Sequence, residues 1–291
     1  MSVDILQEKI RKAKNPLILD LSFLPEHIPA HIRETLDDAQ ATMAYCCALI
    51  NALKEEVVGV RFSFGQFAMM GPRGLIGLSE LLTLCRQLEL YTLLDSVEIL
   101  TPWAADRGAA TFFGADSEFS CDGLVLSPYI GTDGMKPFLP ACKEGGKDLF
   151  FALRTANKSA SDIQDLLTGS RHVHNAAADL VCRFGDAIVG KFGYSNLAGL
   201  ASATAPGVLT DLRKRYTRLF LLVDGCDYPG GNARNAAYAF DRFGRGAAVC
   251  VGSSVTGAWY AAESDGRDFA EQAIKALERV KRNIARYVTI V

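Results

Sequence analysis

The segment Tyr91-Thr-Leu-Leu-Asp-Ser-Val-Glu-Ile-Leu100 shows the pattern that decides the fold of this chain of 291 residues. Four apolar or β-prone residues run directly into Asp95, and the polar residues Ser96 and Glu98 follow. Short runs that are apolar on both faces are typical of strands in a buried parallel sheet. The segment therefore predicts a buried strand over Tyr91–Leu94 with polar side chains at its carboxyl end.

Similar apolar runs recur along the whole chain, and helical patterns separate most of them. The predicted strands are Pro16–Leu21, Val57–Phe62, Tyr91–Leu94, Gly123–Leu126, Leu149–Leu153, Ala187–Gly190, Leu219–Val223 and Ala247–Val251. The predicted helices are Ala30–Leu53, Gly74–Leu88, a turn or short helix over Thr101–Phe113, Met135–Lys143, Ala160–Leu167 leading into Val173–Phe184, Pro206–Tyr216, Ala233–Phe243 and Gly266–Val280. This alternation predicts a TIM (β/α)8 barrel, with a doubly wound open sheet as the alternative. No linker or short repeat interrupts the pattern, so residues 1–291 are predicted to form one domain.

Composition narrows the classes of protein to consider. Hydrophobic residues make up 49% of the chain, which is enough for a large core, and the net charge of -2 gives no electrostatic case for nucleic-acid or membrane binding. The eight cysteines include no C-x-x-C pair, which favours buried, reduced thiols in a cytosolic protein. The N-terminus lacks an apolar signal sequence, and no apolar run reaches the roughly 18 residues of a membrane span. We therefore expect a cytoplasmic protein.

Polar side chains at strand ends are the candidates for function, because the active sites of TIM barrels lie where strands lead into the following loops. The positions expected at this mouth are Asp20 and Ser22, Arg61 and Ser63, Asp95 and Glu98, Ser127, Arg154 to Asn157, the Gly193–Pro206 loop, Asp224 to Gly231, and Ser253 to Thr256. Backbone amides at Ser253 and Ser254 can bind an anion if a helix begins there.

Several of these strand ends carry short motifs in a fixed order. They are Gly71 with Gly74, Ser127-Pro-Tyr-Ile-Gly131, Arg154-Thr-Ala-Asn157 followed by Asp162-Ile-Gln164, Ala203-Thr204 with Pro206, and Gly225 with Gly230-Gly231. In order and spacing they resemble the motifs of type 2 orotidine 5'-monophosphate decarboxylases over nearly the whole chain. That family belongs to pyrimidine biosynthesis, removes CO2 without a cofactor and usually forms dimers.

The resemblance implies a set of ligand-binding positions and a homodimer that binds a nucleotide or another phosphorylated small molecule. The implied ligand-binding residues are Ser22, Ser127, Thr155, Asn157, Thr204, Gly230, Gly231, Ser253 and Ser254. Asp95 and Arg61 stand at the family's catalytic positions. No cofactor is implied.

The family's catalytic pattern is nevertheless replaced at most positions. Its third-strand motif is Asp-x-Lys-x-x-Asp. This chain keeps Asp95 but has Val97 in place of the Lys and Leu100 in place of the second Asp. The remaining replacements are Ser22 for the first-strand Asp, Arg61 for the second-strand Lys, Ser63 for a nearby Gln, Ala156 for a Ser at the base, and Pro229 and Val255 for a Gln and an Arg at the phosphate. No lysine lies between Lys54 and Lys136, so no shift of alignment restores the proton donor.

These replacements predict a barrel without normal decarboxylase activity, because that chemistry depends on a preorganised network of charged groups. An enzyme of changed chemistry is the alternative, because Asp20, Asp95 and Asp224 together can hold a hard divalent metal or act as acid and base. These residues also have a purely structural explanation, in which Asp95 and Arg61 pair with each other. A working decarboxylase with a rearranged site is a third possibility, and no zinc site is expected.

The second loop is unusually apolar, and this leaves two interpretations open. Its apolar residues are Phe62, Phe64, Phe67, Met69 and Met70. They are predicted to fill the core, with a contact between subunits as the alternative.

Overall fold

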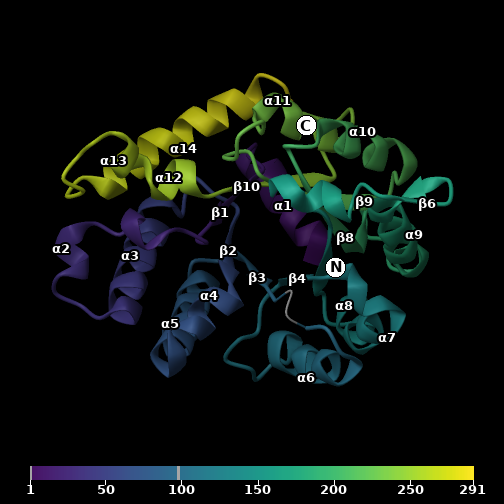
Figure 1. Ribbon diagram of the computed structural model, residues 1–291, viewed down its shortest axis with the longest axis horizontal. Coiled ribbons are helices and arrows are strands. Elements are labelled where there is room, and N and C mark those ends of the chain that lie inside the picture. Colours follow the sequence, from purple (N-terminus) through teal and green to yellow (C-terminus); the bar gives the residue numbers. More distant parts are fainter. Residues whose placement is uncertain (1, 97–98) are drawn as a thin grey trace.

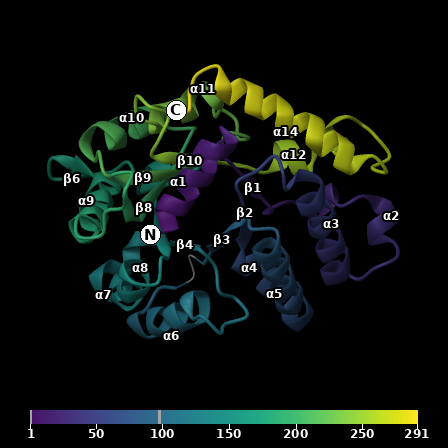
Figure 2. The same cartoon turned by 180° about the vertical axis from the view of Figure 1, so that it is seen from behind.

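A closed barrel of eight parallel strands forms the centre of the computed structural model, which describes residues 2–96 and 99–291 (Figure 1). The strands follow the order β1-β10-β9-β8-β5-β4-β3-β2, and β1 pairs with both β2 and β10 to close the ring. Helices surround this ring in both views (Figures 1 and 2). The prediction of a TIM barrel is therefore confirmed, and the doubly wound open sheet is wrong.

The barrel strands have the bounds β1 Leu17–Asp20, β2 Gly59–Ser63, β3 Tyr91–Asp95, β4 Gly123–Leu126, β5 Asp148–Arg154, β8 Ser195–Ser202, β9 Leu219–Asp224 and β10 Ala247–Val251. The α-helices are α1 Ser2–Ala13, α2 Ala30–Arg33, α3 Asp38–Leu53, α4 Phe64–Met69, α5 Gly71–Gln87, α6 Pro102–Phe113, α7 Gly131–Met135, α8 Leu139–Lys143, α9 Val173–Gly185, α10 Pro206–Arg215, α11 Ala233–Ala236, α12 Ser253–Thr256, α13 Ala258–Ala261 and α14 Phe269–Ala285. Short 3-10 helices are η1 Pro25–His27, η2 Pro128–Ile130, η3 Lys136–Phe138, η4 Lys158–Asp162 and η5 Ala237–Ala239. A small antiparallel hairpin pairs β6 Leu167–Thr168 with β7 Arg171–His172.

Side chains alternate between the barrel interior and the surrounding helices, as the period of two along a strand requires. On β3, Tyr91 and Leu93 belong to the interior cluster, while Leu94 belongs to the cluster under the helices. On β9, Phe220 and Leu222 face inward in the same way. The next inward positions at the carboxyl ends are polar, and they form the site.

Helix α1 closes the opposite end of the barrel and was not predicted from the sequence. It lies over the middle of the barrel in both views (Figures 1 and 2), and its residues Val3, Leu6 and Ile10 join the interior cluster. The amide of Val3 donates to Asp148 Oδ1 over 2.9 Å, which satisfies one donor at the helix N-terminus. Asp4 accepts hydrogen bonds from the amides of Lys191 and Phe192.

The predicted sixth strand, Ala187–Gly190, is wrong. The sixth strand of the barrel is β8, Ser195–Ser202, and it occupies the first part of the predicted Gly193–Pro206 loop. All of its residues are buried, but only Leu197 and Leu200 are bulky and apolar, and the other six are small or polar, so the run gives a weak strand signal. Gly199 has no room for a side chain, because an added Cβ would lie 2.5 Å from Leu153 Cδ1.

Several predicted helices are shorter or broken. Ala30–Leu53 divides into α2 and α3, because Asp37 accepts a hydrogen bond from the Gln40 amide and caps a new helix. Ala160–Leu167 is not an α-helix: it contains the end of η4 and leads into the β6–β7 hairpin. The segments Met135–Lys143 and Ala233–Phe243 contain short α and 3-10 turns, and α14 begins at Phe269 rather than Gly266. Within the described residues, no helix is long and apolar enough to cross a membrane.

The role of α1 can be tested with adjacent residues. Leu6→Ala should lower the free energy of unfolding by about 2–5 kcal/mol, because Leu6 is fully buried in the barrel interior. Ile5→Ala should change it by less than about 0.5 kcal/mol, because Ile5 is 54% exposed. Denaturant unfolding followed by circular dichroism measures both values. Equal effects of the two substitutions would show that α1 does not plug the barrel.

Candidate functional site at the carboxyl ends of the strands

An arginine with two carboxylate partners forms the centre of the barrel mouth. Arg61 lies near the end of β2, and the register of the sheet places it directly beside Asp20 on β1. Its Nη1 donates to Asp20 Oδ2 over 3.1 Å, and its Nη2 donates to Asp95 Oδ2 at the end of β3. The pairing of Arg61 with Asp95 is thus confirmed, and Asp20 joins it as a second partner.

This ion-pair cluster is largely buried. The Arg61 side chain is only 9% exposed, and those of Asp20 and Asp95 are 15% and 18% exposed. Burial disfavours the charged guanidinium, but Asp20 and Asp95 outweigh it and raise the pKa of Arg61 well above its ordinary value. Arg61 is therefore a fixed positive charge in this mouth and not a proton donor.

The same arginine bears on the alternative of a metal site. Its guanidinium is the cation that Asp20 and Asp95 already share. Across residues 2–96 and 99–291, no group of three or more His, Cys, Asp or Glu side chains is arranged to hold a metal ion. The acidic residues therefore act here as partners of an arginine.

Asp224 brings a third carboxylate to the cluster from the end of β9. Burial is the main cause that raises the pKa of Asp224 to about 6, with Arg61 opposing the shift and Asp20 adding to it. Its Oδ1 is inaccessible to solvent and accepts no hydrogen bond from the described residues, and the same holds for Asp95 Oδ1. Cys250 on β10 lies beside Arg61, and burial raises the pKa of its thiol.

A cavity of about 610 Å³ opens over this cluster. Its charged lining residues, among those described, are Asp20, Asp95, Asp224, Asp227 and Arg61. The remaining lining includes Ser22, Phe23, Leu24, His27, Ser63, Gln66, Gly225, Tyr228, Pro229, Cys250, Gly252 and Ser253. This volume lies within the range that small-molecule sites usually occupy.

The loop after β9 places a carboxylate next to the amides of Ser253 and Ser254, where an anion was expected to bind. Asp227 Oδ2 accepts a hydrogen bond of 2.7 Å from the Gly252 amide, immediately before α12. The loop can fold this tightly because Gly230 adopts φ +90, and because a Cβ on Gly231 would lie 1.8 Å from the Gly225 carbonyl oxygen. Ser253 and Ser254 are both exposed at the start of α12, and Ser253 lines the cavity.

Other predicted ligand positions lie away from this cavity. Ser127 and Thr155 line a separate cavity of about 410 Å³ together with Gln164 and His174. The Thr155 hydroxyl donates to the exposed Asn157 over 2.6 Å, and its amide donates to Gln164 Oε1. Neither cavity is lined by all of the implied positions, so the structure separates Ser22 and Ser253 from Ser127 and Thr155.

Thr204 and the glycines after β9 lie on the side of the mouth formed by β8 and β9. Thr204 Oγ1 lies 3.0 Å from Ser202 Oγ, and the Thr204 amide donates to that same oxygen. The Gly230 carbonyl accepts a hydrogen bond from Asn235 Nδ2 over 3.0 Å. Thr204 and Gly230 therefore support the loops at the mouth through contacts within the protein.

The positions where family residues are replaced have different surroundings. Val255 is fully buried in the core, so this position does not face the cavity. Pro229 lines the cavity, and Ala156 packs beside Gly225. Leu100 is 59% exposed. Val97 and Glu98 lie outside the described residues.

Six cavity residues were not singled out from the sequence as site residues: Phe23, Leu24, His27, Gln66, Cys250 and Gly252. His27 is buried in η1, where its Nδ1 lies 3.1 Å from Thr256 Oγ1, and burial lowers its pKa. Phe23 and Gln66 meet across the mouth, with Gln66 Nε2 3.5 Å from the Phe23 carbonyl oxygen. Of these residues, only Cys250 could have been found from the sequence, because it lies two residues after an inward-facing position of a predicted strand.

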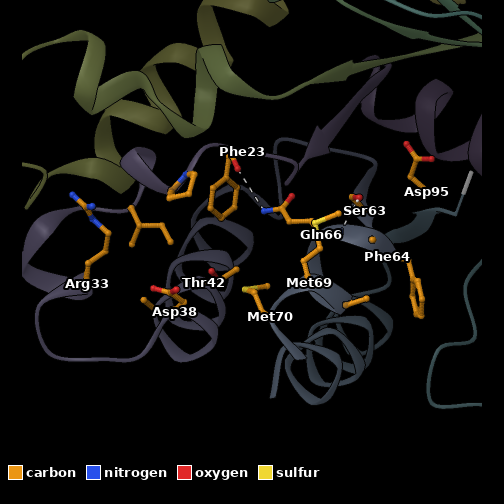
Figure 3. Close-up of a pocket in the computed structure, with 15 residues that line it drawn as sticks. Phe23, Arg33, Asp38, Thr42, Ser63, Phe64, Gln66, Met69, Met70 and Asp95 are labelled. Atoms are coloured by element: carbon orange, nitrogen blue, oxygen red, sulfur yellow. Dashed lines mark hydrogen bonds between the residues drawn. The ribbon is translucent and has the colours of Figure 1, made fainter. Parts of the chain in front are cut away.

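A second, larger hollow adjoins the cavity on the side of α3 and α4. It measures about 1080 Å³, and its lining shares Phe23, Ser63, Gln66 and Asp95 with the inner cavity. Figure 3 shows Asp95 and Ser63 at one end, Gln66, Phe23 and Met69 along the middle, and Arg33 at the far end. We call the smaller hollow the inner cavity and the larger one the outer groove.

The apolar second loop divides between the core and this groove. Phe62 and Phe67 are buried and meet edge to face, which confirms core filling for these two residues. Phe64 and Met70 line the outer groove while also packing against the core, and Met69 is 89% exposed in the groove. Core filling is therefore wrong for Met69.

Comparison with known proteins supports one family. No family model matches the chain. It is 27% identical to the orotidine 5'-phosphate decarboxylase of Caldicellulosiruptor bescii over 97% of both chains, and 28% identical to that of Rhodopirellula baltica over 77% of this chain and 78% of the relative. A Leishmania donovani OMP decarboxylase has the same fold, with a TM-score of 0.71 at 22% identity, over 97% of this chain and all of the other.

A second solved structure, described as an orotidine-monophosphate decarboxylase from Toxoplasma gondii, has a TM-score of 0.79 at 20% identity. It covers 97% of this chain, and this chain covers 98% of it. The structures share the barrel, and the sequence matches extend through nearly every strand and loop. Sequence and fold together show that this chain is similar to the orotidine 5'-phosphate decarboxylases.

Proposed function

We propose that this chain is a barrel related to orotidine 5'-phosphate decarboxylases that does not decarboxylate orotidine 5'-phosphate, and that its mouth binds another small molecule. The observation that carries the proposal is Arg61 held between Asp20 and Asp95. In the expected mechanism a lysine supplies a proton to a developing carbanion, whereas Arg61 is held in its charged form. The sequence has Val97 where the second lysine of the mechanism is expected.

The binding of a small molecule is supported by the shape of the mouth. The inner cavity and the outer groove share four lining residues, so they form one continuous recess at the carboxyl ends of β1 to β3. A barrel that has lost decarboxylase activity can still keep this recess. The predicted homodimer and the cytoplasmic location stay predictions, as does the single domain over residues 1–291.

A second candidate function is acid–base chemistry centred on Asp224. A carboxyl group with a pKa near 6 is poised to exchange a proton near neutral pH, and Asp224 Oδ1 has no partner among the described residues. Asp224 lines the inner cavity beside Arg61. This reading requires a substrate other than orotidine 5'-phosphate.

The lost activity is tested directly. Purified protein at high concentration should leave the ultraviolet absorbance of orotidine 5'-phosphate unchanged, while the Caldicellulosiruptor bescii relative serves as the positive control. The physical reason is the absence of a lysine proton donor near Asp95 in the sequence. Turnover that disappears in an Asp95→Ala variant would overturn the proposal and show that another residue donates the proton.

The environment of Asp224 is tested through the pH dependence of stability. Its pKa is raised in the folded state, so the folded protein holds this proton more tightly than the unfolded chain, and stability falls as pH rises from about 4 to about 6. Asp224→Asn removes the buried charge and should raise the free energy of unfolding at pH 7.5 by about 1–3 kcal/mol, with no gain at pH 4.

Asp106→Asn is the matched control, because Asp106 is exposed on α6. It should leave the difference in the free energy of unfolding between pH 4 and pH 7.5 unchanged. Chemical denaturation at both pH values measures the effect. A gain of equal size at both pH values would show that Asp224 is not titrating in this window.

A further inference from the structure

Carboxylates outnumber cations in the inner cavity, and this identifies the chemical class of its ligand. Among the described residues, four aspartates and one arginine line the cavity. Arg61 is shared by Asp20 and Asp95, so it cannot also neutralise Asp224 and Asp227 at contact distance. A phosphate or carboxylate entering this space would meet uncompensated negative charge, whereas a cation would be attracted.

One backbone amide next to the expected anion site is also occupied. Anions often bind to backbone amides at the start of a helix. Here the amide of Gly252, just before α12, already donates to Asp227 Oδ2 over 2.7 Å. The protein's own carboxylate therefore satisfies a donor that a phosphate oxygen would need, and it adds a negative charge at that point.

Aromatic rings point to an organic cation independently of the charge count. Oδ1 of Asp95 and Oδ1 of Asp224 are both inaccessible to solvent and accept no hydrogen bond from the described residues. An ammonium in the cavity does not reach these two atoms, so the carboxylates attract it at longer range. Phe23 and Tyr228 line the same cavity, and aromatic faces attract organic cations.

The outer groove shows what the rest of the ligand is like. It begins at Asp95 and Ser63 and continues past Phe23, Phe64 and Met69, so an apolar surface starts where the acidic cavity ends (Figure 3). Met69 is 89% exposed there, and an apolar ligand segment would cover it. The two hollows together therefore match a molecule with one charged end and an apolar body.

We propose that this mouth binds a small organic cation, with its ammonium or amidinium group in the inner cavity beside Asp95, Asp224 and Asp227 and its apolar body in the outer groove. The inference rests on the proposed function that the mouth binds a small molecule. The carboxylates attract the ammonium electrostatically, and burial of the alkyl or aryl body supplies hydrophobic binding energy.

A series of simple amines tests this assignment. Butylamine and hexylamine are titrated into the full-length protein by calorimetry near pH 7.5, with hexanol, hexanoate, uridine 5'-phosphate, inorganic phosphate and MgCl2 as comparison probes. Hexylamine should bind more tightly than butylamine, by up to about fourfold for each added methylene group. Hexanol and hexanoate should bind much more weakly or not at all.

Two pairs of variants separate the two halves of the site. Asp227→Asn keeps an acceptor for the Gly252 amide but removes the charge, so it should weaken the binding of hexylamine about tenfold. The control Asp116→Asn, at an exposed residue, should leave the binding of hexylamine unchanged. Met69→Lys should weaken hexylamine more than butylamine. Ile76→Lys, at a residue that is 60% exposed outside the groove, should change neither.

The opposing outcomes are distinct. Tighter binding of uridine 5'-phosphate or phosphate than of hexylamine would overturn the cation assignment while leaving the absence of decarboxylation intact. Binding of Mg²⁺ abolished by Asp227→Asn would replace the organic cation with a metal. Equal binding of hexylamine and hexanol would show a purely apolar site. A dimer that Met69→Lys dissociates without weakening hexylamine would show that a second copy covers the groove.

Discussion

The buried ion pairs of Arg61 with Asp20 and Asp95 are the constraint on which the mouth of this barrel depends. Taking a guanidinium out of water is costly, and it is tolerated here because two carboxylates on the flanking strands meet it. The closed barrel makes this possible, because β2 lies between β1 and β3 and all three strands end on the same side. The cluster sets both the charge and the inner wall of the cavity.

That arrangement explains why family resemblance and local chemistry point in different directions. The scaffold follows the orotidine 5'-phosphate decarboxylases in sequence and fold across most of the chain. At the mouth, an arginine is neutralised by its neighbours, and further carboxylates remain around it. Fold is set by the buried apolar residues of strands and helices, whereas function depends on a few polar positions that can change without disturbing them.

Much of the barrel was predictable because its strands are short, apolar and repeated. Runs such as Leu219–Val223 and Ala247–Val251 have no stable place except a buried parallel sheet, and their carboxyl ends identify the mouth. Ser195–Ser202 was missed because small residues pack there against larger neighbours such as Leu153, a fit that no local pattern shows. Helix α1 was missed because its function as a plug depends on the barrel interior that it covers.

By itself, the sequence determined the barrel class, the polar strand ends and the possibility that Arg61 pairs with Asp95. Only the tertiary structure decided that Asp20 shares the same arginine, that Asp227 reaches the Gly252 amide, and that the inner cavity opens into an apolar groove. The physical reason is range. Hydrophobic periodicity acts between neighbours along the chain, whereas hydrogen bonds and charge balance at the mouth join residues as far apart as Asp20 and Asp224, which meet only when the barrel closes.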